Sequence, residues 1–113
     1  MTRSVTGFVS LPPNAPAGPA ARVLVEVRDV SSADAPSTVV GEQVQADIQL
    51  APGGRVPFRV QVPDLDPTAV YGLRVHVDLS GSGILEAGDL ITTQATPVPA
   101  ESTDRLIAPV TVV

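Results

Sequence analysis

The chain has 113 residues, a length that predicts one domain, residues 1–113, with a single hydrophobic core. It contains no cysteine, which excludes a disulfide framework and thiol catalysis. Twelve acidic residues against seven arginines give a net charge of −5, so nucleic acid is not an expected partner. No apolar run could span a membrane and no leader segment or lipid-attachment cysteine is recognisable, so we expect no membrane insertion and, by default, a cytoplasmic location.

Apolar and polar residues alternate with a period of two along much of the chain, as in strands with one buried face. The predicted strands, in chain order, are residues 4–11, 22–28, 38–50, 56–62, 71–79, 90–94 and 105–113. In the clearest of them, the residues predicted to be buried are Val25, Val27, Phe58, Val60, Leu73, Val75 and Val77. In 38–50 they are Val40, Val44, Ala46, Ile48 and Leu50. Short strands separated by turns rich in proline and glycine predict an all-β fold, an antiparallel sandwich of about seven strands.

Proline and tyrosine refine this prediction locally. Pro57 and Pro109 interrupt strand patterns, and because proline cannot donate a backbone hydrogen bond, we expect them at sheet edges or bulges. The proline-rich residues 12–19 are predicted to cross the surface between the first two strands. Tyr71 enters its strand after the turn 65–70, which is similar to a tyrosine corner, where the hydroxyl anchors the preceding loop.

Residues 78–89 have the spacing of a calcium-binding loop from which much of the charge is missing. The predicted ligands are Asp78, Ser80, Ser82, the carbonyl oxygen of Ile84, Glu86 through water, and Asp89. Because hydroxyls stand where strong sites place carboxylates or amides, calcium is expected to bind weakly or not at all. The alternative is a glycine-rich hairpin loop, in which Gly81, Gly83 and Gly88 adopt positive φ angles.

No catalytic residue is predicted. His76 is the single histidine and would lie on the solvent face of its strand. Neither Ser80 nor Ser82 occupies the sharp strand-to-helix turn that exposes serine nucleophiles. Asp64 and Asp66 lie in a proline-bounded turn, where aspartate usually accepts hydrogen bonds from nearby backbone amides. We therefore expect no enzyme activity.

Five segments follow one another in a family-like order: GFVSLPPNA at 7–15, VEVRDVSSADAP at 25–36, VPFRVQVP at 56–63, the tyrosine-led strand 71–77, and TTQATPV at 92–98. Through them the chain resembles the YbaY/YscW family of small bacterial proteins. The resemblance implies a transthyretin-like or immunoglobulin-like β-sandwich. That family includes envelope lipoproteins and pilotin-type chaperones that help outer-membrane secretins to localise, so the resemblance also implies an envelope location and a protein partner.

The sequence thus favours a non-catalytic interaction or accessory module of the YbaY/YscW type, chaperone-like by resemblance. Such a module would bind an unidentified protein through an edge strand or an exposed loop. The alternative function is a structural accessory domain whose 78–89 loop binds calcium weakly. No other cofactor is expected, and no oligomeric state is predicted.

Overall fold

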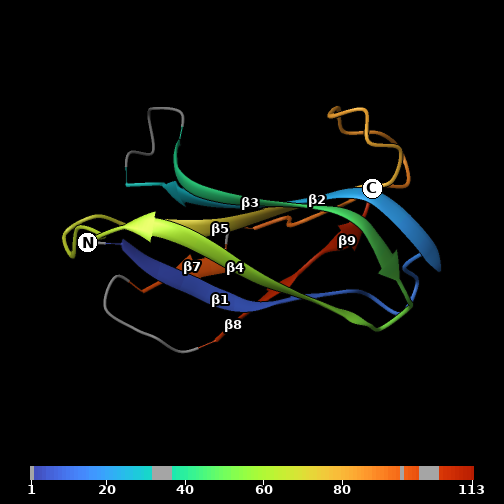
Figure 1. Ribbon diagram of the computed structural model, residues 1–113, viewed down its shortest axis with the longest axis horizontal. Coiled ribbons are helices and arrows are strands. Elements are labelled where there is room, and N and C mark those ends of the chain that lie inside the picture. Colours follow the sequence, from blue (N-terminus) through green and yellow to red (C-terminus); the bar gives the residue numbers. More distant parts are fainter. Residues whose placement is uncertain (1, 32–36, 95, 100–104) are drawn as a thin grey trace.

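The computed structural model describes residues 2–31, 37–94, 96–99 and 105–113. Their regular structure consists of strands, so the predicted all-β class is confirmed. The strands are β1 (Thr2–Ser10), β2 (Gly18–Asp29), β3 (Thr38–Leu50), β4 (Arg55–Pro63), β5 (Tyr71–Asp78), β6 (Leu90–Ile91), β7 (Thr96–Val98), β8 (Leu106–Pro109) and β9 (Thr111–Val112) (Figure 1). None of the described segments forms a helix with the length and apolar character needed to cross a bilayer.

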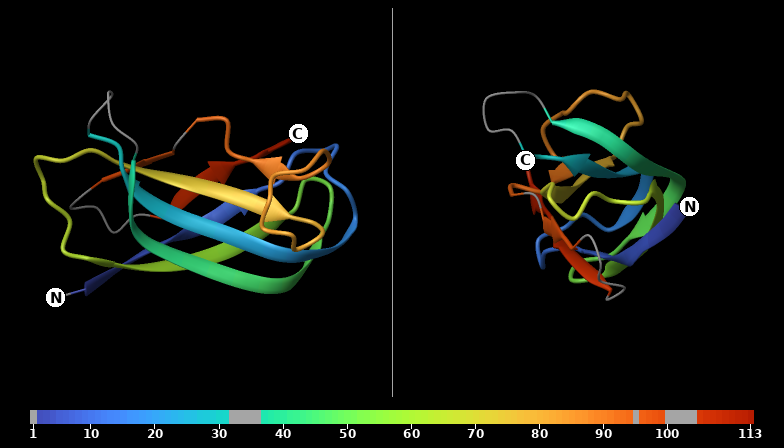
Figure 2. Two further views of the ribbon diagram at one scale, coloured as in Figure 1. Left: turned by 90° about the horizontal axis from the view of Figure 1, so that it is seen from above. Right: turned by 90° about the vertical axis from the view of Figure 1, so that its left-hand side faces the viewer.

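Two sheets pack face to face, and the two layers are visible in Figure 2. The smaller sheet has the order β4-β1-β8, and the larger has the order β3-β2-β5-β6-β9, with β7 also paired to β5. All pairs are antiparallel except β1 with β8. The predicted sandwich is confirmed with two differences. The expected strand 105–113 crosses from the smaller to the larger sheet at the buried Val110 and therefore forms two strands, β8 and β9. Residues 96–98 form the additional strand β7.

The core lies between the inner faces of the two sheets. All seven residues predicted to be buried in the clearest strands are at most 4% exposed. Strands β2 and β5 of the larger sheet show why, because their register places Val25 opposite Val75 and further apolar pairs lie on the same face. Each valine fully buried in this way contributes about 1.5–3 kcal/mol through removal of apolar surface from water.

Strand β3 corrects part of the prediction. Val44 and Ala46 were expected to face the core but are exposed, Val44 to 51%, whereas Leu50 is buried as expected. The pairing register with β2 instead directs Gln43 and Gln45 toward the inner side. The alternation of this strand is therefore reversed over its middle, with polar residues inward and apolar residues outward.

The two glutamines have partners on β4, across the open side of the sandwich. The Gln43 side-chain oxygen accepts a hydrogen bond from the Arg59 backbone N–H at 2.8 Å, and the Gln45 amide donates to the Pro57 carbonyl at 2.9 Å. Glutamine at these positions covers backbone groups of an edge strand that would otherwise be open to another strand, and valine could not form these bonds. The inward polar face of β3 therefore closes this edge of β4.

Both edge prolines and the tyrosine corner are confirmed. Pro57 and Pro109 lie in β4 and β8, the two edge strands of the smaller sheet. The Tyr71 hydroxyl accepts a hydrogen bond from the Asp66 backbone N–H at 2.9 Å. This bond ties the preceding turn to the start of β5, the strand that carries the residues of the candidate site.

Truncating a core valine should cost much more stability than truncating an exposed one. We expect Val60→Ala, at a fully buried position, to lower the free energy of unfolding by about 1–3 kcal/mol. The matched control Val44→Ala should change it by less than about 0.5 kcal/mol, because this side chain is half exposed. Urea unfolding measures both. Equal losses would contradict the reversed orientation of β3.

Candidate functional site

The loop between β5 and β6 begins and ends with a buried aspartate. Asp78 is the last residue of β5 and Asp89 directly precedes β6, and their exposures are 1% and 2%. The pairing of Val77 with Leu90 brings the two ends of the loop together. Among the described residues these are the buried charged side chains, so each carboxylate needs compensating hydrogen bonds.

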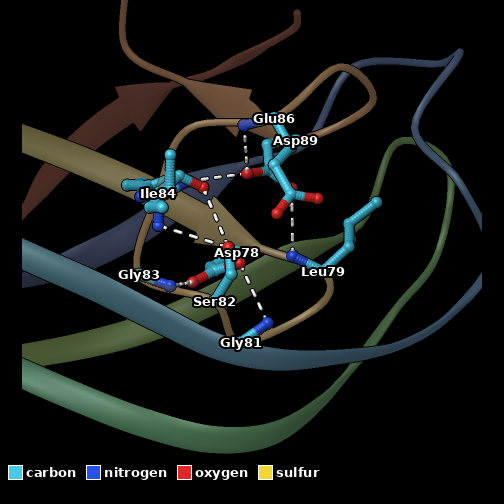
Figure 3. Close-up of polar contacts among 9 residues, drawn as sticks. Asp78, Leu79, Gly81, Ser82, Gly83, Ile84, Glu86 and Asp89 are labelled. Carbon is cyan, nitrogen blue, oxygen red and sulfur yellow. Dashed lines mark hydrogen bonds and ion pairs between the residues drawn. The ribbon is translucent and has the colours of Figure 1, made fainter.

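Asp78 organises the first half of the loop. Its Oδ1 accepts a hydrogen bond from the Gly81 N–H at 2.9 Å, and its Oδ2 accepts one from the Gly83 N–H at 2.8 Å (Figure 3). The two glycines have φ angles of 78° and 80°, a backbone conformation that residues with a Cβ rarely adopt. The predicted positive φ angles at Gly81, Gly83 and also Gly88 are therefore confirmed.

Asp89 closes the second half of the loop onto β5. Its Oδ1 accepts a hydrogen bond from the Leu79 N–H at 3.1 Å, and its Oδ2 accepts one from the Glu86 N–H at 3.1 Å (Figure 3). The same Oδ2 lies 2.9 Å from His76 Nε2. Burial acts to raise the pKa of Asp89, but the hydrogen bonds from His76 and from the two backbone amides outweigh it, so the pKa lies below its ordinary value.

The structure brings some of the predicted calcium ligands together and not others. Asp78 and Asp89 converge, and ligand atoms of both lie within 4.8 Å of each other and of His76, which was not predicted as a ligand. Ser82 and Ile84 bond each other locally, since the Ser82 hydroxyl donates to the Ile84 carbonyl at 3.3 Å. The side chains of Ser80 and Glu86 are exposed. Calcium binding by the six predicted residues stays a prediction.

His76 lies on the outer face of β5 and is partly exposed, close to the expected position. Its link to Asp89 could not be read from the sequence, because it depends on β6 pairing beside β5 with His76 opposite Ile91. A histidine–aspartate pair needs a hydroxyl or thiol on its histidine to act in nucleophilic catalysis. In the part of the chain that the structure describes, no hydroxyl hydrogen-bonds to His76.

A shallow cleft lies beside this loop on the outer face of the larger sheet. Its volume is about 240 Å³, and it is lined by Glu26, Arg28, Arg74, Val75, His76, Leu85, Ile91 and Thr92. Glu26 and Arg28 form an ion pair at 3.2 Å. Leu85, at the rim, is 48% exposed and its neighbour Ile84 is 69% exposed. The anchored loop thus holds apolar side chains in solvent next to a charged cleft.

Removing the charge of Asp89 should destabilise the fold. In Asp89→Asn one carboxylate oxygen becomes an amide that cannot accept hydrogen bonds, so at least one loop amide loses its partner, which costs about 1–3 kcal/mol. Urea unfolding at neutral pH measures the loss. Glu86→Gln is the control, because this side chain is exposed; an equal loss in both variants would contradict the role of Asp89.

The stability difference between the wild type and Asp89→Asn should depend on pH. A carboxyl group whose folded-state pKa is lowered stabilises the protein above its unfolded pKa and loses this contribution as the pH falls through the folded value. For Asp89 the difference should therefore be complete at neutral pH and should shrink below pH 3.8. Titrating groups that do not contact Asp89 affect both proteins equally and cancel. A difference that stays constant down to about pH 2.5 would show that the charge of Asp89 is not what stabilises the loop.

This architecture is similar to that of a known protein. A solved structure described as an alternative pilotin from the type II secretion system of Vibrio cholerae is similar over 99% of this chain and 96% of that one, with 23% identity and a TM-score of 0.72. That likeness supports the fold. A search of curated sequences finds no match. The family described as type III secretion system lipoprotein chaperone (YscW) matches residues 1–106, nearly the entire chain, and the chain therefore belongs to the YscW family.

Proposed function

We propose that this protein is a non-catalytic, chaperone-like accessory protein that acts at the bacterial envelope and binds a secretin subunit of a secretion system. The family description, a secretion-system lipoprotein chaperone, supports the accessory role and favours the envelope over the cytoplasmic default. The observation that carries the binding role is the pair of exposed apolar side chains, Ile84 and Leu85, held beside the cleft by a loop with two buried anchors.

The chemistry of the site favours binding over catalysis. Both carboxylates direct their oxygens to backbone amides of the loop, and the histidine is bonded to one of them. A general base must reach a proton of the substrate or of a nucleophile. Here the titratable groups instead hold a loop in one conformation, which pre-organises a recognition surface at low entropic cost.

The edges of the smaller sheet are less suited to binding than the loop. On β4, the Arg59 N–H and the Pro57 carbonyl already have side-chain partners from β3, and Pro57 has no N–H. On the other edge of the smaller sheet, β8 has four residues and ends at Pro109. Strand addition requires a row of open backbone groups. Of the two routes considered from the sequence, we therefore favour the exposed loop.

The cleft also indicates the character of the bound segment. Leu85 and Ile91 supply apolar contacts, and Arg74 is exposed at the same cleft. Glu26, opposite Arg74 in the sheet, is bonded to Arg28 instead. A segment that places an apolar side chain on Leu85 and an acceptor or carboxylate on Arg74 would satisfy both sides of the cleft.

The test is binding of the purified protein to a secretin subunit of the same bacterium. Leu85→Asp should weaken binding about tenfold or more, because a charge would replace an apolar side chain that contacts the partner in the proposed interface. The control Val70→Asp alters a side chain that is also exposed, to 59%, in the turn at the opposite end of β5, and should leave binding unchanged. Titration calorimetry measures both. Equal affinity of the wild type and Leu85→Asp would contradict the proposed site.

A further inference from the structure

The outer face of the smaller sheet carries positive charge, although the chain as a whole is acidic. Arg55 and Arg59 point outward from β4, and Arg105 directly precedes β8. No acidic residue occurs in β1, β4 or β8. We call this surface the arginine face and define it by these three arginines together with Phe8 and Ile107, which lie side by side in the register of β1 and β8.

Two of the three guanidinium groups are held against the sheet. Arg59 Nε donates a hydrogen bond to the Ser4 hydroxyl at 3.0 Å, which leaves its terminal nitrogens outside that bond. The Arg55 guanidinium carbon lies 4.4 Å from the centre of the Phe8 ring, in a cation–π contact that leaves the N–H groups at the rim available. Within the described ranges, no carboxylate forms an ion pair with Arg55, Arg59 or Arg105. Guanidinium groups fixed in this way match the geometry of carboxylates.

A hollow lies on the same face. Its volume is about 260 Å³, and it is lined by Thr6, Gly7, Phe8, Pro57, Phe58 and Arg105. Ile107, paired with Phe8, is 55% exposed. The face therefore combines a place for an apolar side chain with cationic groups around it.

From this combination we infer that the arginine face is a second docking surface, which binds an acidic segment of a protein partner with an apolar residue between carboxylates. Charge complementarity selects an anionic ligand, and the hollow selects a polypeptide side chain. An anionic lipid surface is less well matched, since it attracts basic side chains without regard to their orientation and has no group for a hollow of this size. The face lies on the other sheet from the cleft at Leu85, so this inference goes beyond the proposed function and does not depend on it.

The test uses fluorescence anisotropy with a labelled nine-residue peptide, Glu-Glu-Gly-Glu-Leu-Glu-Gly-Glu-Glu, and the full chain. The protein should bind this peptide and not the version in which lysine replaces every glutamate. Raising the salt from about 50 mM to about 500 mM should weaken binding several-fold, because exposed charges are screened. Arg59→Glu should weaken binding about fivefold or more, and Arg59→Lys should retain part of the affinity.

The matched control is Arg22→Glu, the same charge reversal at a partly exposed position of β2 in the other sheet, outside both the cleft and the arginine face. This variant should change the affinity for the peptide by less than about twofold, if the affinity depends on where the charge is reversed and not on the net charge of the protein. Circular dichroism and urea unfolding establish that each variant is folded. Leu85→Asp should leave peptide binding unaltered, which separates this inference from the proposed function.

Two results would overturn the inference. The first is no peptide binding by the wild type, and the second is an equal loss of affinity in Arg59→Glu and Arg22→Glu. If the peptide does not bind, binding to phosphatidylglycerol vesicles is measured next, with the wild type and with Arg59→Glu; here the expected alternative is vesicle binding that Arg59→Glu abolishes. That last outcome would assign the arginine face to a membrane surface.

Discussion

The loop between β5 and β6 depends on two buried carboxylates. A charge removed from water is costly unless hydrogen bonds replace its hydration. Asp78 and Asp89 meet this requirement with four backbone amides of their own loop and one histidine. Satisfying the two charges therefore determines the path of the loop, and with it the place of Leu85 beside the cleft.

The same arrangement accounts for a loop that has the spacing of a calcium site but little of its charge. In the structure the backbone amides of Gly81 and Gly83 approach the Asp78 carboxylate, as a positively charged ligand would. The amides carry partial positive charge and are part of the chain, so they compensate part of the carboxylate charge. This reading explains why the glycines and aspartates stand where they do even with hydroxyls at the intervening positions.

The edge strands β3 and β4 influence which surfaces of the protein remain available to bind a partner. Between β3 and β4, glutamine side chains occupy backbone groups that would otherwise be open to another strand. Gly41 helps this approach, because a Cβ at that position would lie 2.5 Å from the Gln61 carbonyl oxygen. With this edge occupied, the two surfaces proposed for partners are the cleft with its apolar loop and the arginine face on the other sheet. For a chaperone-like protein, two surfaces of different chemistry would allow two segments to be held at once.

The sequence alone determined the sandwich and its central strands, through the alternation of apolar and polar residues. It also determined the edge prolines and the Tyr71 corner, through the residue types at those positions. These features follow from local rules, since a period of two selects one face and proline lacks an N–H. Only the tertiary structure decided the orientation of β3, where Val44 faces solvent and Gln43 and Gln45 on the opposite face bond the edge of β4. Likewise the bond between His76 and Asp89 exists because β6 pairs with β5. Both depend on contacts between strands distant in sequence, and a local pattern carries no information about which strands become neighbours.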